Sequence, residues 1–238
     1  MKRLFLVFGL AASTFAATAQ TNEEFKSFKP FQGDVTTEVG LAGGLNNADF
    51  TLNEGASGLL RFRYFLKDKL ALRAGFNLSS TSEKENIYGT GSNDGRKGTV
   101  TTSGTAFLLN VGIEKHFAGT ARLSPYVGGD VMFGVAGQKE KMTNTDGNVY
   151  INNVSSETKG PGTFGIGVRG VVGADYYIAK HVYLGAEAGF GFMYGKEGKT
   201  TINTNVGGTS TSTTIESAGS SFELNPSVIT GIRIGFVF

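Results

Sequence analysis

The 238-residue sequence contains no cysteine, no tryptophan, four prolines and two histidines. Without cysteine there are no disulfides, zinc ribbons or thiol chemistry. His116 and His181 are too few for a His-rich metal site or for catalysis by several histidines. The formal net charge is only +2, so the electrostatic footprint of a nucleic-acid-binding protein is missing, and we expect no nucleic-acid partner.

Long hydrophobic runs are missing after the N-terminus, where residues 1–19 have the three parts of a secretory signal peptide. Lys2 and Arg3 precede a short apolar run, and Ala17-Thr18-Ala19 supplies the cleavage site. A buried N-terminal strand or helix is the alternative, but nothing in the segment alternates. We predict cleavage after Ala19 and a periplasmic lead over 20–32. Because Lys2 and Arg3 carry the excess positive charge, the mature chain is neutral.

The sequence does contain 36 glycines and repeated segments of about ten residues in which apolar side chains alternate with small or polar ones. This period of two is that of a β-strand with two different faces. Eight segments show it: 34–45, 57–65, 70–78, 105–116, 123–136, 163–177, 181–194 and 222–238. Short links alternate with long polar ones, which places the long links at one end of an up-and-down sheet. The long links cover 79–104, 137–162 and 195–221, with a shorter one at 46–56.

One face of every segment is free of charge, and the opposite face is rich in glycine and carries the charged residues. A soluble barrel would bury the apolar face, so alternation alone leaves the orientation open. Eight strands leave an interior just wide enough for side chains, which suits the glycine-rich face. With the signal peptide, this favours an all-β, eight-stranded antiparallel up-and-down transmembrane β-barrel over 33–238, in a bacterial outer membrane. Aromatic residues expected to form an interfacial girdle at the short-link end are Phe65, Phe117, Tyr176, Tyr177, Tyr183 and Phe238.

The C-terminal segment 228–238 ends on Phe238 and has apolar residues at alternate positions before it, namely Ile232, Ile234 and Phe236. This segment resembles the eight-stranded outer-membrane barrels of the OmpA transmembrane-domain and OmpX type, and the resemblance extends over 33–238. It implies that the last strand is the signal read by the barrel-assembly machinery. It also implies outer-membrane lipid as the surrounding medium.

The inward face carries charges of both signs, and buried charges persist only when they are paired and hydrogen-bonded. A turn centred near residue 179 places Arg169 almost opposite Glu187. Arg61 faces Arg73 across the hairpin before it, so we expect carboxylates on the flanking strands to neutralise them. The predicted lumen ion-pair network consists of Glu38, Arg61, Arg63, Arg73, Glu114, Asp130, Arg169, Asp175, Glu187 and Arg233, with Glu223 on the same face.

Three functions are compatible with this pattern. The first is a structural or surface-exposed protein for adhesion or recognition, with a lumen plugged by ion pairs and an extracellular ligand at the long links. The second is a small passive porin-like channel, and the third is a soluble exported barrel that binds an apolar ligand as lipocalins do. The long links are either mobile, or the last two strands, 181–194 and 222–238, extend well beyond the membrane, since 201–214 is rich in strong β-formers. Both histidines lie beside short links, at the end of the barrel opposite the long links, so neither can reach chemistry at the long-link end. We therefore expect no enzyme, and we expect no cofactor.

Overall fold

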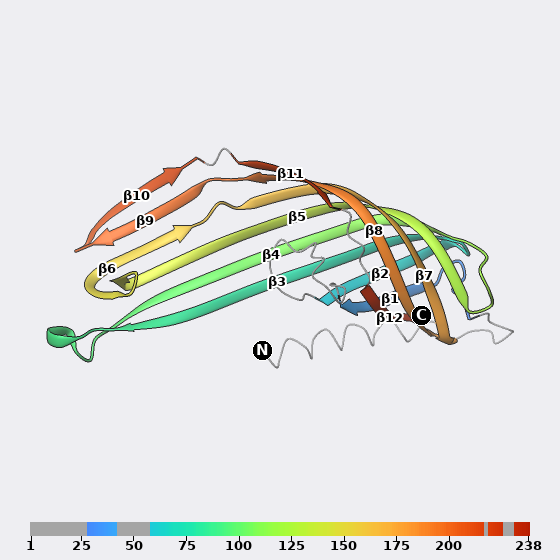
Figure 1. The fold of residues 1–238 in the computed structure, drawn as a ribbon, viewed down its shortest axis with the longest axis horizontal. Helices are drawn as coiled ribbons and strands as arrows, with labels where there is room; N and C mark the ends of the chain where they lie inside the picture. The colour runs from blue at the N-terminus through green and yellow to red at the C-terminus, as the bar shows by residue number, and fades with distance from the viewer. Residues whose placement is uncertain (1–27, 42–57, 217–218, 226–230) are drawn as a thin grey trace.

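A computed structural model describes residues 28–41, 58–216, 219–225 and 231–238 (Figure 1). The predicted signal peptide, the lead up to residue 27 and the link 46–56 lie outside the described residues. The described strands are β1 (Val35–Leu41), β2 (Gly58–Lys67), β3 (Leu70–Tyr88), β4 (Lys97–His116), β5 (Leu123–Asp146), β6 (Val149–Lys159), β7 (Thr163–Ala179), β8 (Val182–Glu197), β9 (Thr200–Val206), β10 (Thr209–Ile215), β11 (Ser220–Asn225) and β12 (Gly231–Val237).

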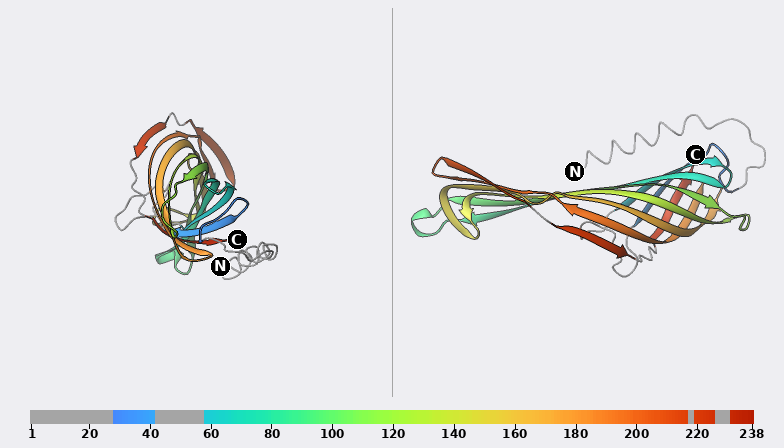
Figure 2. Two further views of the ribbon diagram at one scale, coloured as in Figure 1. Left: turned by 90° about the vertical axis from the view of Figure 1, so that its right-hand side faces the viewer. Right: turned by 90° about the horizontal axis from the view of Figure 1, so that it is seen from above.

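Eight of these strands close into a ring. The order is β1-β2-β3-β4-β5-β7-β8-β12, and β12 pairs back onto β1, with every pairing antiparallel. The ring is seen end-on in the left view of Figure 2. The predicted last strand comprises β11 and β12, which pair with successive stretches of β8. The predicted eight-stranded up-and-down barrel is confirmed. A single 3-10 turn, η2 (Gly91–Asn93), is the only helical element in the described residues.

Among the residues that the structure describes, no helix has the length and apolarity needed to cross a membrane.

The apolar face of the ring points outward and the charged face points inward. Val39 and Val168 are each 52% exposed, whereas Arg63 is 1% exposed. A soluble barrel with an apolar cavity requires the opposite orientation, so the lipocalin-like alternative is wrong. On β5 the outward apolar residues run from Val127 to Val135, a length close to that of a tilted membrane-spanning strand.

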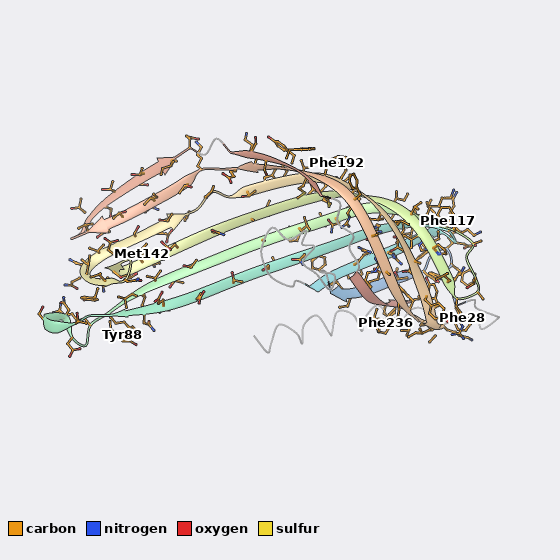
Figure 3. The ribbon with its side chains drawn as sticks, in the orientation of Figure 1. Phe28, Tyr88, Phe117, Met142, Phe192 and Phe236 are labelled. Carbon is orange, nitrogen blue, oxygen red and sulfur yellow. The ribbon has the colours of Figure 1, made fainter. Side chains whose placement is uncertain are left out.

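Half of the predicted aromatic girdle is in the wrong place. Phe65, Tyr177 and Tyr183 are at most 1% exposed and lie inside the barrel. Tyr176 and Tyr177 are neighbours on β7, so their side chains must point to opposite faces. Phe117, Tyr176 and Phe238 are exposed on the outside at the short-turn end, and Figure 3 shows Phe117 and Phe236 at this end.

The long polar links form strands that extend the barrel wall. β3, β4 and β5 continue well past the apolar band, and the hairpin β9–β10 pairs with β6. Residues 200–215, which the sequence leaves as either mobile or an extension of the last two strands, form the hairpin β9–β10, and this hairpin attaches to β6. We call the projecting sheet of order β3-β4-β5-β6-β9-β10 the platform. It comprises residues 79–88, 97–106, 137–146 and 149–159 together with β9 and β10, and Figures 1 and 2 show it reaching away from the closed ring.

Glycine is required where an inward-pointing side chain packs against the backbone of a neighbouring strand. A Cβ on Gly235 would lie 2.1 Å from Cζ of Tyr183, whose hydroxyl donates to Glu38 Oε1 at 2.8 Å. We therefore expect Gly235→Val to lower the free energy of unfolding by about 1–3 kcal/mol, the usual cost of overpacking. Urea unfolding in micelles, followed by the migration difference between boiled and unboiled samples, measures this. Gly170→Val on the outer surface, where the nearest atom is 3.9 Å away, is the matched control. Equal unfolding midpoints for the two variants would contradict the prediction.

Candidate functional site

The ten charged residues of the predicted network lie inside the barrel, and each of the eight ring strands contributes at least one. None is more than 7% exposed. Alternation places them there, because each lies on the face opposite the apolar residues of its strand. The side chain of Glu223 lies outside the described residues. The layer holds five arginines and five carboxylates: Glu38, Arg61, Arg63, Arg73, Glu114, Asp130, Arg169, Asp175, Glu187 and Arg233.

Glu187 on β8 is the centre of one half of the layer. Its carboxylate lies 3.0 Å from Arg61 Nη1, 2.9 Å from Arg73 Nη1 and 2.9 Å from Arg233 Nη1. The hydroxyl of Tyr126 donates to it at 2.7 Å. Three arginines from three strands therefore converge on one carboxylate, which links β2, β3 and β12 to β8 across the lumen.

Arg63 on β2 is the centre of the other half. Its guanidinium lies 2.8 Å from Glu38 Oε1, 2.7 Å from Glu114 Oε1 and 2.5 Å from Asp175 Oδ2. Its Cζ also lies 4.9 Å from the centre of the Tyr126 ring, a cation–π distance. In this half one arginine contacts three carboxylates, whereas in the other half one carboxylate contacts three arginines.

Asp130 joins Arg73 and Arg169. Its carboxylate lies 2.9 Å from Arg73 Nε and 2.5 Å from Arg169 Nη2. The expected pairing of Arg169 with Glu187 is wrong, since Arg169 lies opposite Gly191 on β8 and directly opposite Asp130 on β5. The turn of this hairpin falls at residues 180–181, and an irregularity between Tyr177 and Ala179 shifts the register.

The hairpin β2–β3 shows the same kind of error. Arg63, in place of Arg61, lies directly opposite Arg73, because the turn falls at residues 68–69 and the register shifts between Phe65 and Lys67. The facing arginines are neutralised from the flanking strands, by Glu38 on β1 and Glu114 on β4. Flanking carboxylates therefore hold like charges in adjacent positions that would otherwise repel.

Three further polar residues, which were not predicted from the sequence, complete the layer. Tyr126 and Tyr183 donate to carboxylates, and His116 Nε2 lies 2.9 Å from Glu114 Oε1 while its Nδ1 lies 2.9 Å from Ser124 Oγ. All three occupy inward positions of their strands, which is the signal that identifies them. His181 is elsewhere, in the turn before β8, with Nδ1 3.1 Å from the Val237 carbonyl oxygen. No group of three or more potential ligands in the described residues is arranged to hold a metal ion.

The residues of the predicted assembly signal lie on β12 and at its end. Ile234, Phe236 and Phe238 are 42%, 41% and 39% exposed on the outer surface. Ile232 pairs with Ala186 of β8, and its side chain lies outside the described set.

Comparison with known proteins gives a family and several similar structures. The model of the family described as "Putative OmpA-OmpF-like porin family" matches residues 56–238. A major outer membrane protein of Thermus thermophilus is 13% identical, with a TM-score of 0.45 over 86% of this chain and 98% of the other. OprG of Pseudomonas aeruginosa is 13% identical, with a TM-score of 0.41 over 89% and 99%. Ail, the attachment invasion locus protein of Yersinia pestis, is 11% identical, with a TM-score of 0.35 over 87% and 99%. A search among curated proteins returned no match.

The convergence of three arginines on Glu187 predicts a large effect of removing its charge. Glu187→Gln leaves Arg61, Arg73 and Arg233 buried with one carboxylate fewer, and breaking a buried pair from one side costs about 3–5 kcal/mol. We expect a lower urea midpoint and a smaller folded fraction on unboiled gels. Glu83→Gln makes the same chemical change at an exposed position of the platform and should leave both unchanged. An unaltered midpoint for Glu187→Gln would show that the layer does not stabilise the barrel.

Proposed function

Because the chain belongs to the putative OmpA-OmpF-like porin family, and is thus an integral β-barrel of the bacterial outer membrane, we propose that it is a surface-recognition protein. In this proposal the barrel anchors the chain and the charged layer closes the lumen. The platform, which projects beyond the membrane, carries the recognition surface. Its partner is an extracellular ligand.

The observation that supports a closed lumen is the density of the charged layer. Side chains from all eight ring strands meet within it, and several of them form ion pairs with residues on two or more other strands. Eight strands leave an interior that side chains can fill. A solute would have to separate several buried ion pairs to pass, and each separation exposes a charge without its partner.

The support for recognition by the platform is its extent and its independence from the ring. β9 and β10 pair only with each other and with β6 among the described strands. They add no hydrogen bond to the closed barrel, so barrel stability does not account for them. We further propose that the assembly machinery reads the outward residues Ile234, Phe236 and Phe238, and that the protein is not an enzyme.

A passive channel is the second candidate, and the porin description of the family favours it. Single-channel recording separates the two. We expect wild-type protein in planar bilayers to show no large, steady pore. We also expect Arg233→Leu to reduce the folded fraction more than it raises conductance, because Arg233 pairs with Glu187 and Asp175. A large, steady wild-type conductance would overturn the closed-lumen proposal.

Removing the β9–β10 hairpin tests the independence of the platform. Replacing residues 201–214 by a short Gly-Ser linker should leave outer-membrane fractionation and the boiled-to-unboiled shift intact, because the ring contains neither strand. Binding of whole cells to the extracellular ligand should be lost. Failure of the deletion variant to reach the outer membrane, with the signal peptide retained, would show that the hairpin is part of the folding unit.

A further inference from the structure

The two faces of the platform carry opposite charges. On β5 the run Lys139-Glu140-Lys141 places its lysines on one face and its glutamate on the other. On β3 the run Glu83-Lys84-Glu85 places its lysine on the same face as the β5 lysines and its glutamates on the opposite face. The face with the lysines continues the lipid-facing surface of the barrel, and we call it the outer face. The inner face continues the lumen. On the described strands of the platform the outer face carries Lys84, Lys97, Lys139, Lys141 and Lys159, and the inner face carries Glu83, Glu85 and Glu140.

The strand register aligns these side chains in rows across the sheet. In one row Lys84 lies opposite Thr101, Thr101 opposite Lys141, and Lys141 opposite Glu157. The row continues through β9 and β10 with Asn203 and Ser212. The row therefore runs from lysines on β3 and β5 to amides and hydroxyls on β9 and β10.

Glu157 is the acidic residue of this row. Its carboxylate lies 2.8 Å from Lys139 Nζ and 3.5 Å from Lys159 Nζ. The hydrogen bond from Lys139 lowers the pKa of Glu157 below its usual value. Within the described residues no ion pair joins Lys84 or Lys141 to a carboxylate, and the outer face keeps a net positive charge.

A groove of about 460 Å³ lies on this face, above β6, β9 and β10. Ser212 Oγ donates to Asn203 Oδ1 at 2.7 Å, and Asn205 Nδ2 donates to Ser210 Oγ at 2.8 Å. These hydrogen bonds hold the floor of the groove in place across two strands. Side chains that line it include Lys141, Ser155, Glu157, Asn203, Asn205 and Ser212.

We propose that this groove binds an anionic saccharide, a proposal that rests on the platform being the recognition surface. Amides and hydroxyls held in rows hydrogen-bond the hydroxyls of a sugar, and Lys141 at the edge of the groove pairs with a carboxylate, sulfate or phosphate. The lining contains no aliphatic or aromatic side chain, so an apolar ligand gains little there. Lys139 lies four residues beyond Val135, the last outward apolar residue of β5, or about 13 Å along the strand. The groove therefore lies in the saccharide layer above the membrane.

Calorimetry on the full mature protein in nanodiscs of zwitterionic lipid tests this, with a galacturonate hexamer as the charged probe and maltohexaose as the neutral one. We expect the galacturonate hexamer to bind and maltohexaose to bind at least roughly tenfold more weakly. Lys141→Gln should weaken binding of the charged probe by a similar factor. Glu157→Gln should strengthen it, because Lys139 and Lys159 lose their competing carboxylate.

Glu140→Gln is the matched control, since it changes one charge on the same strand but on the inner face. It should leave the affinity unchanged. Equal binding of both probes, no binding of the galacturonate hexamer, or effects of Lys141→Gln and Glu140→Gln that merely follow net charge would each overturn the proposal.

Nanodiscs that contain lipopolysaccharide distinguish two sources of the saccharide. If the groove holds sugars of its own membrane, lipopolysaccharide will compete with the galacturonate hexamer, and Lys141→Gln will abolish that competition. If the groove takes saccharides from outside, the affinity will be unchanged. Failure of saccharide binding together with a silent lumen would refute this inference alone. A steady pore with saccharide binding intact would instead refute the closed-barrel function.

Discussion

Neutralisation of buried charge is the constraint on which the rest of the structure depends. Ten charged side chains at 7% exposure or less are compatible with a folded barrel only if each faces opposite charge. A slip of one residue in any ring strand would turn its charged residue toward lipid and an apolar residue inward. A slip of two would keep the face but separate the partners. The layer therefore specifies the register of all eight ring strands together, through contacts that no hairpin could make alone.

The faces of the strands could be predicted from the sequence, but the partners across the lumen could not. The period of two alone predicts that the side chains of Arg169 and Glu187 point into the barrel. Pairing them needs the hairpin register, and here the turn at residues 180–181, together with an irregularity between Tyr177 and Ala179, places Arg169 opposite Gly191. The turn at residues 68–69 and the irregularity on β2 between Phe65 and Lys67 place Arg63 opposite Arg73 in the same way. Such irregularities occur at short turns, and their position depends on local backbone geometry that the apolar pattern does not record.

The platform was only half predictable for a related reason. Within the membrane one face must be apolar, so a strand is recognised by its contrast with the other face. Beyond the apolar band both faces meet water, and a segment such as 79–88 looks like a polar loop although it continues β3 without a break. Only the β-forming residues of 200–215 gave a signal there. The prediction that Tyr177 and Tyr183 lie at the interface was wrong because a tyrosine side chain suits both an interface and a packed interior.

The alternation of charge on the platform cannot come from the contrast between lipid and lumen. Glu83 and Lys84 are exposed, and Lys139 and Glu140 are partly exposed, on a single-layer sheet, so neither face has to exclude charge. An edge strand gains protection from charges on either face, which accounts for charges on β3 but not for the lysines of β5 in the interior of the sheet. Separating lysines from glutamates over three strands leaves like charges close together on each face, at some cost in repulsion. The proposed binding of an anion to the outer face would account for that cost, and the polar groove beside Lys141 lies on the same face.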